Sequence, residues 1–131
     1  MTSKERLERW AAVMDEAAAD GRPLNMRFWL PGTGGHPSGA ARCAASWAAL
    51  DPALAAEGLR ISAYGGPVPG PPSSHVAFSG EQSNYGVVAA FFGISGGDAR
   101  FLTHPDFYAA LPLAAEVAAR IRAVAAGPVR A

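Results

Sequence analysis

The predicted fold is built around the stretch Asn84–Tyr108, NYGVVAAFFGISGGDARFLTHPDFY. Its first half has apolar residues at helical spacing: Tyr85, Val88, Ala89 and Phe92. Gly93 follows at once, where a helix ends most easily in a left-handed residue. Ser95 stands three residues before Asp98, the spacing of a capping box at the start of a second helix. Pro105 ends that helix, because the residue before a proline is pushed out of helical geometry. The stretch therefore predicts two short helices joined by a tight turn.

A helix–turn–helix of this size raises DNA binding as one function. Arg100 is the only basic residue of the second helix, and Asp98 lies close to it. The chain has 11 basic and 11 acidic residues, whereas affinity for DNA comes largely from neutralised phosphates. The sequence favours a helix corner that closes a core, and a DNA-binding regulator built on residues 87–102 remains the alternative.

The composition is that of a folded domain. The chain has 131 residues, of which 50% are hydrophobic and 17% charged, so it can bury a core and is not a disordered segment. Much of the apolar fraction is alanine, which predicts closely packed helices anchored by a few aromatic residues. We expect one domain over residues 1–131. Its fold class is mainly α, or α+β, with five or six short helices and a small β-hairpin or two- to three-stranded sheet.

The two ends of the chain are predicted to be helical. The first helix runs from about Ser3 to Ala19, with Thr2 and Glu5 at capping-box spacing. Its predicted buried stripe is Leu7, Trp10, Ala11, Met14 and Ala18. The last helix opens at Leu111-Pro112 and ends at Gly127. Its predicted buried stripe is Leu113, Val117, Ile121 and Val124.

The middle of the chain predicts two further helices and a hairpin. Gly39–Leu50 reads as a helix that buries Cys43, Trp47 and Leu50. Asp51-Pro52 is an N-cap followed by proline at the first helical position, and this short helix ends at Gly58. Residues 59–63 and His75–Phe78 are predicted to pair as short strands. The proline- and glycine-rich segment 65–74 between them excludes helix and central strand.

Leu24–Leu30 is a strand candidate because apolar and other side chains alternate along it. The alternation places Arg27 and Trp29 on the outer face, and such a pair is typical of binding hot spots. Two alternatives are that Trp29 is covered by the same domain, and that the segment is an irregular lead-in without a sheet. Arg27, Trp29, Arg42 and Tyr64 are the candidate protein-binding residues.

Chemistry-bearing side chains are few and scattered. Cys43 is the only cysteine, which excludes an intrachain disulfide and indicates a small buried hydrophobe. His36, His75 and His104 show no zinc-ligand spacing. The glycine-rich loop 31–38 lacks the Gly-Lys-Ser/Thr ending of a phosphate-binding loop. We expect no catalytic residue, no metal and no cofactor; an enzyme using Cys43 or a histidine cluster is the alternative.

Two motifs resemble those of a set of small proteins from actinobacterial and other GC-rich phages and bacteria. The first motif of that set is Cys-Gly-Thr-x-x-Cys-x-x-Gly-Trp. Gly39, Cys43 and Trp47 match it, and Ser38, Ala40 and Ser46 depart from it. Residues 93–102 are similar to the second motif, Gly-Leu-Ser/Thr-x-x-Glu/Asp-Ala-x-x-Leu, and residues 118–121 to an Ala-Ala-Arg-Ile closing helix. The resemblance implies a short accessory protein that binds host or rival machinery, and it implies no catalytic residue.

These observations predict a small soluble non-enzymatic protein that binds another protein. Its more specific form is an inhibitor of a host defence complex, similar to anti-CRISPR proteins. A cytoplasmic location is expected because the charged N-terminus has no apolar signal core. No membrane partner is expected, since the alanine-rich run 108–127 contains Glu116, Arg120 and Arg122. The sequence leaves the oligomeric state open.

Overall fold

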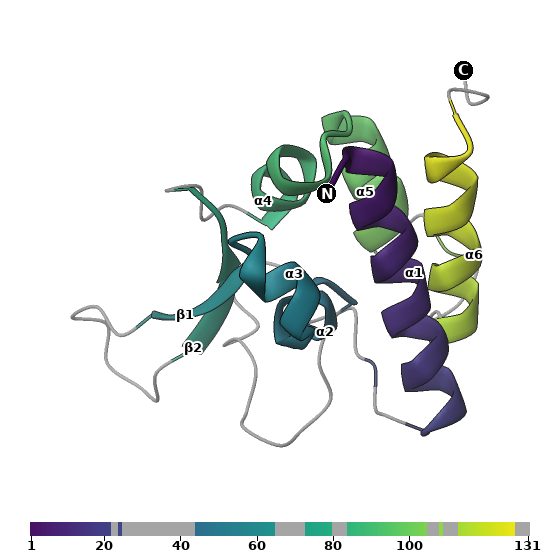
Figure 1. Cartoon of the computed structure of the whole chain (residues 1–131), viewed down its shortest axis with the longest axis horizontal. Coiled ribbons are helices and arrows are strands. Elements are labelled where there is room, and N and C mark those ends of the chain that lie inside the picture. The colour runs from purple at the N-terminus through teal and green to yellow at the C-terminus, as the bar shows by residue number, and fades with distance from the viewer. Residues whose placement is uncertain are drawn as a thin grey trace.

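The structure, a computed structural model, describes residues 1–21, 24, 44–64, 73–79, 84–104, 108 and 113–127 (Figure 1). This part of the chain contains six helices and one two-stranded sheet. In chain order they are α1 (Ser3–Ala19), α2 (Ala44–Leu50), α3 (Pro52–Ala56), β1 (Arg60–Tyr64), β2 (Ser73–Ala77), α4 (Asn84–Phe92), α5 (Gly96–Thr103) and α6 (Ala114–Ala125). The predicted mainly helical fold with a small hairpin is confirmed.

The long helices α1 and α6 lie side by side and run in opposite directions (Figure 1). Helices α2 and α3 lie between this pair and the β1–β2 hairpin, while α4 and α5 pack near the start of α1. Among the described residues, no helix has both the length and the apolar character needed to cross a membrane.

Helix α1 has the bounds that the sequence predicts, and its capping box is present. The Thr2 hydroxyl accepts a hydrogen bond from the Glu5 backbone at 3.1 Å, and the Glu5 carboxylate accepts one from the Thr2 backbone at 3.0 Å. One predicted core position is wrong: Ala18 is exposed and Ala17 is buried instead. The buried side of α1 contains Leu7, Trp10, Met14 and Ala17. The buried stripe therefore ends at Ala17, one residue before the predicted Ala18.

Trp10 is the centre of the core. Its ring stacks on Phe92 with centroids 4.4 Å apart, and its indole N–H donates to the Ala44 carbonyl at 3.0 Å. Phe91 meets Phe92 edge to face at 4.8 Å and Phe78 at 5.0 Å. Trp10 therefore joins α1 to α2 and α4, with its polar N–H satisfied as burial requires.

Helix α4 buries a broader face than predicted. Its buried side chains are Val87, Val88, Phe91 and Phe92. Tyr85 and Ala89, which the periodicity places in the core, are only partly buried. The difference arises because α4 packs against both α5 and the hairpin, so neighbouring residues face different partners.

The turn between α4 and α5 confirms the predicted glycine stop and the Ser95 half of the predicted capping box. Gly93 is left-handed with a φ of +67°, and the Ser95 hydroxyl accepts from the Asp98 backbone at 3.0 Å. His104 is extended, with φ −80° and ψ 125°, and ends α5 before Pro105. An added Cβ at Gly93 would lie 2.2 Å from the Ser3 hydroxyl oxygen, so the turn closes tightly over the start of α1.

Helix α2 is described from Ala44 onward, so the predicted positions 39–43, Cys43 among them, lie outside the described residues. Its buried residues are Ala44, Ala45, Ser46, Ala48 and Ala49. Leu50, predicted to be core, is 48% exposed, because the chain turns at Asp51 into α3. Leu113, also predicted to be core, is 75% exposed, because it precedes the first turn of α6.

The hairpin is antiparallel, and its register runs from Arg60 opposite Ala77 to Tyr64 opposite Ser73. The predicted pairing is confirmed, with each strand shifted by one or two residues. Of the strand predicted at 24–30, only Leu24 belongs to the described part, and it packs partly buried against the core.

Candidate functional site

The residues predicted to bind a partner are not brought together by the described part of the chain. Arg27, Trp29 and Arg42 lie outside the described residues. Tyr64 is the last residue of β1, where its backbone stands opposite Ser73. The prediction that these four residues form one surface stays a prediction.

The predicted chemistry-bearing residues also lie apart in what is described. His36 and Cys43 fall outside the described residues, and His75 is placed by its backbone in β2, opposite Ser62. His104 ends α5, and its ring stacks on Tyr85 with centroids 6.0 Å apart. In the described ranges, no three His, Cys, Asp or Glu side chains are grouped so that they could hold a metal ion.

Most cationic side chains in the described part have a carboxylate partner. The pairs are Lys4–Glu8, Arg6–Glu57, Arg9–Asp51 and Arg122–Asp15. Arg120 instead donates to the Phe101 carbonyl at 3.1 Å, and its guanidinium lies 3.6 Å from the centroid of the buried Tyr108 ring. Apart from the Lys4–Glu8 pair, which lies within α1, these contacts join different elements of the fold, and each of the four paired cations has a carboxylate beside it.

Arg60 and Arg100 differ from the cations just described. Both are exposed, and neither pairs with a carboxylate in the part of the chain that the structure describes. The Arg100 guanidinium lies 5.5 Å from the centroid of the Tyr85 ring, within the range of a cation–π contact. Arg60, at the start of β1, has no such ring among the described residues.

Arg100, Tyr85, His104 and Gly96 form one surface, which we call the Arg100 patch. Gly96 and Arg100 are four residues apart and so share a face of α5, and His104 is the extended C-cap residue that follows the helix. Tyr85 comes from the first turn of α4 and contacts both Arg100 and His104. Gly96 is exposed, and nothing lies within 4 Å of where its Cβ would be.

Sequence reasoning missed this patch. The spacing of Arg100 and His104 is visible in the sequence, and that signal could have indicated a shared helix face. The sequence places Tyr85 in the core stripe of α4, however, and gives no sign that its ring meets α5. Only the folding of α4 back on α5 through Gly93 brings the three side chains together.

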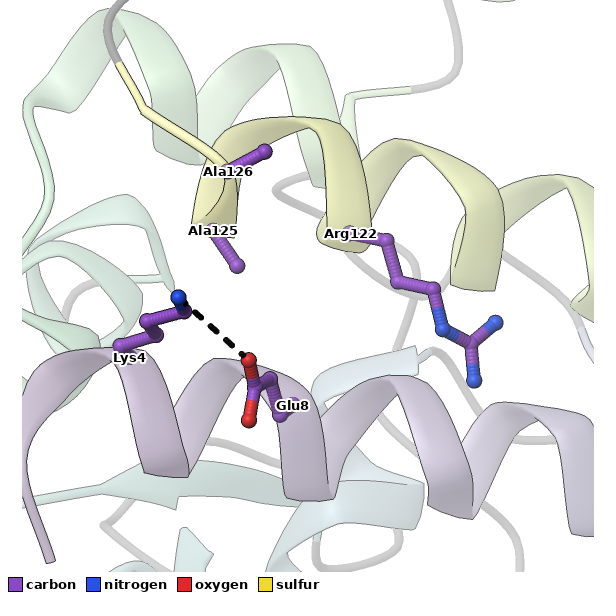
Figure 2. A pocket seen from close by; sticks show the side chains of 5 residues that line it. All are labelled: Lys4, Glu8, Arg122, Ala125 and Ala126. Carbon is purple, nitrogen blue, oxygen red and sulfur yellow. Dashed lines mark ion pairs between the residues drawn. The ribbon is translucent and has the colours of Figure 1, made fainter.

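A second surface is a groove between α1 and α6 (Figure 2). Its volume is about 430 Å³, and its lining residues are Lys4, Glu8, Arg122, Ala125 and Ala126. Lys4 pairs with Glu8 at 4.0 Å, the contact drawn in Figure 2, and Arg122 pairs with Asp15. Because each cation of the groove already has a carboxylate beside it, the groove presents no unbalanced charge for a ligand.

The Arg100 patch is therefore the better candidate site. A guanidinium has five N–H donors in a fixed fork, which suits a two-point contact with a carboxylate or phosphate. The Tyr85 ring supports the Arg100 side chain, and a pre-organised side chain loses less entropy when it binds.

The chain matches no family model, no curated protein and no solved structure. Its function is therefore inferred from the side chains of the patch.

Proposed function

We propose that this protein is a small non-enzymatic protein that binds another protein through the Arg100 patch. The observation that supports this most is the exposed Arg100 guanidinium held over the Tyr85 ring, without a carboxylate partner among the described residues. Arginine and tyrosine are the residue types, with tryptophan, that most often supply the binding energy of protein interfaces.

The rigidity of α5 also supports the proposal. Ala99, Leu102 and Thr103 of α5 are buried against the rest of the domain, while Arg100 is exposed. Arg120 of α6 donates to the Phe101 carbonyl, and the Tyr108 hydroxyl donates to the Leu102 carbonyl at 2.7 Å. Binding groups on an element fixed from two sides keep their geometry when a partner approaches.

The finer form of the proposal is inhibition of a host defence complex by stoichiometric binding. What supports it is the sequence resemblance to small phage and actinobacterial proteins, at residues 93–102 and 118–121 among others. Residues 93–102 include the N-cap of α5 and all of the helix except Thr103. In this form Arg27, Trp29, Arg42 and Tyr64 belong to the same interface.

Affinity capture with three baits tests the proposal: the unsubstituted chain, Arg100→Ala and Arg60→Ala. Arg60→Ala is the matched control, since it removes an exposed arginine that has neither a carboxylate partner nor an aromatic ring beside it among the described residues. We expect lysates of GC-rich actinobacterial hosts to yield a protein held by the unsubstituted chain and by Arg60→Ala, and lost with Arg100→Ala. Capture that is absent, or equal for all three baits, contradicts the proposal.

The two alternatives from the sequence have their own assays. A regulator that binds DNA through residues 87–102 shifts random duplex, and the shift weakens steeply as salt rises. An enzyme that uses Cys43 has a thiol that is alkylated quickly in the native protein.

A further inference from the structure

We infer that the Arg100 patch is a docking site for an acidic segment of the partner protein, in which one carboxylate is bound by Arg100. This inference rests on the proposed function and names the chemistry of the contact. It follows from the charges of the described residues, from the shape of the patch and from the number of cations in it.

The charge argument compares Arg100 with the other arginines. Arg6, Arg9 and Arg122 each contact a carboxylate within the chain. In the closest two-point example, Arg9 donates to both oxygens of Asp51, at 3.0 and 2.5 Å. The Arg100 guanidinium has the same arrangement of N–H donors and lies over the Tyr85 ring. Its donors contact no carboxylate among the described residues. The complementary group is a carboxylate supplied by another molecule.

The shape of the patch suits an approaching chain. Gly96 lies one helical turn before Arg100 on the same face, and the space where its Cβ would stand is open. A backbone can therefore come close to α5 beside the guanidinium. The half-buried ring of Tyr85 offers apolar contact to the methylene groups of a Glu side chain.

The number of cations separates an acidic segment from a nucleic acid. A phosphate backbone is bound by several cations along its path. The patch has one guanidinium, and Asp98 is on the same helix. Lys4 and Arg122, the cations of the α1–α6 groove, are occupied by Glu8 and Asp15. One supported arginine suits one carboxylate.

A titration with a synthetic peptide tests this inference. The probe is blocked hexaglutamate, compared with blocked hexaglutamine, and the readout is the two-dimensional NMR spectrum of the full chain. The chain has 11 basic and 11 acidic residues, so general attraction to the acidic peptide is small. We expect hexaglutamate to shift the signals of Tyr85, Arg100 and His104, and hexaglutamine to shift none of them.

Three variants locate the contact. Arg100→Gln is expected to weaken hexaglutamate binding about tenfold, the scale of a lost charged hydrogen bond, while Arg60→Gln leaves it unchanged. Gly96→Glu is the sharpest variant. It places a carboxylate four residues before Arg100, the favourable order for an intrahelical pair, and in the first turn of α5, where negative charge is stabilising. It should therefore keep or raise the melting temperature and still weaken peptide binding.

The outcomes are separable. Equal weakening in Arg100→Gln and Arg60→Gln, unchanged binding in Gly96→Glu, or equal binding of hexaglutamine overturns the inference. Binding of random duplex DNA that is lost in Arg100→Gln overturns it in favour of a nucleic acid. If the affinity capture yields an Arg100-dependent protein and hexaglutamate does not bind, the proposed function is supported and the inference of an acidic segment is refuted. If hexaglutamate binds as expected and no protein is captured, the proposed function is refuted.

Discussion

Arg9 on α1 donates two hydrogen bonds to the buried carboxylate of Asp51, at 3.0 Å from its Nε and 2.5 Å from an Nη. The same carboxylate accepts from the Leu54 backbone at 3.1 Å and so forms the N-cap of α3. A single side chain therefore caps α3 and ties its start to α1.

We expect Asp51→Ala to lower the free energy of unfolding by about 2–3 kcal/mol. The substitution removes a helix cap and leaves the Arg9 guanidinium without its partner; Arg9 is 37% exposed, which keeps the loss below that of a fully buried pair. Urea unfolding measures the change. The control is Asp15→Ala, which breaks the exposed pair with Arg122 and should cost less than about 1 kcal/mol. Equal losses in the two variants would contradict the role given to Asp51.

Acid should destabilise the protein partly through Asp51. The hydrogen bonds from Arg9 hold the pKa of Asp51 below its usual value in the folded state. The stability from this lowered pKa is present above the unfolded value of about 3.9 and is lost as the pH falls through the folded pKa. We expect the melting temperature of the unsubstituted chain to fall more steeply below about pH 4 than that of Asp51→Asn. Glu5 and Glu57, whose pKa values are also lowered, act equally in both proteins. Parallel curves would refute the prediction.

High pH should destabilise the folded protein through the ionisation of Tyr108. Burial raises the pKa of Tyr108 to about 12, while its hydroxyl donates to the Leu102 carbonyl at 2.7 Å. Since the unfolded pKa is about 10, this contribution is complete below about pH 10 and is lost as the pH rises through the folded pKa. Tyr108→Phe should cost about 1 kcal/mol at neutral pH, for the lost hydrogen bond, and flatten the alkaline fall in stability. Tyrosinate absorbance checks the assignment: Tyr108 should ionise only together with unfolding, and its ionisation at pH 10 in the native protein would disprove it.

Gly93→Ala should destabilise the protein by about 2 kcal/mol or more, from backbone strain together with a steric clash. The φ of +67° is costly for alanine, and its Cβ would lie 2.2 Å from the Ser3 hydroxyl oxygen. Gly21→Ala is the matched control, because Gly21 has a φ of +66° and nothing within 4 Å of its added Cβ. The control isolates the strain, about 1 kcal/mol. Thermal unfolding of both variants measures the difference, and equal melting temperatures would show that the contact with Ser3 has no energetic weight.

Local chemistry explains which parts of the fold the sequence could predict. Thr2, Asp51 and Ser95 were recognisable as helix caps because each hydroxyl or carboxylate reaches a backbone N–H only three residues away. Gly93 was recognisable as a stop because a left-handed residue after a helix favours glycine. None of these features depends on what the rest of the chain does.

Burial and the candidate site were predicted less well, because both depend on distant neighbours. Leu50 and Leu113 have the right spacing for a core stripe, yet each lies at a helix end and is exposed, to 48% and 75%. Tyr85 was assigned to the core, but its ring lies between the core and the exposed Arg100. Arg27, Trp29 and Arg42 lie outside the described residues, so the surface predicted from them stays a prediction.

Most helix starts and stops of the described part were predictable from the residues alone, because caps, glycines and prolines act within a few residues. The tertiary structure determines which distant carboxylate an arginine meets, and among the described residues it leaves Arg60 and Arg100 without one. Arg9 and Arg100 are the same residue type on helical segments, and they differ only because folding brings Asp51 to the first and the Tyr85 ring to the second. Charge pairing across elements is set by three-dimensional distance, which the linear spacing of residues does not contain.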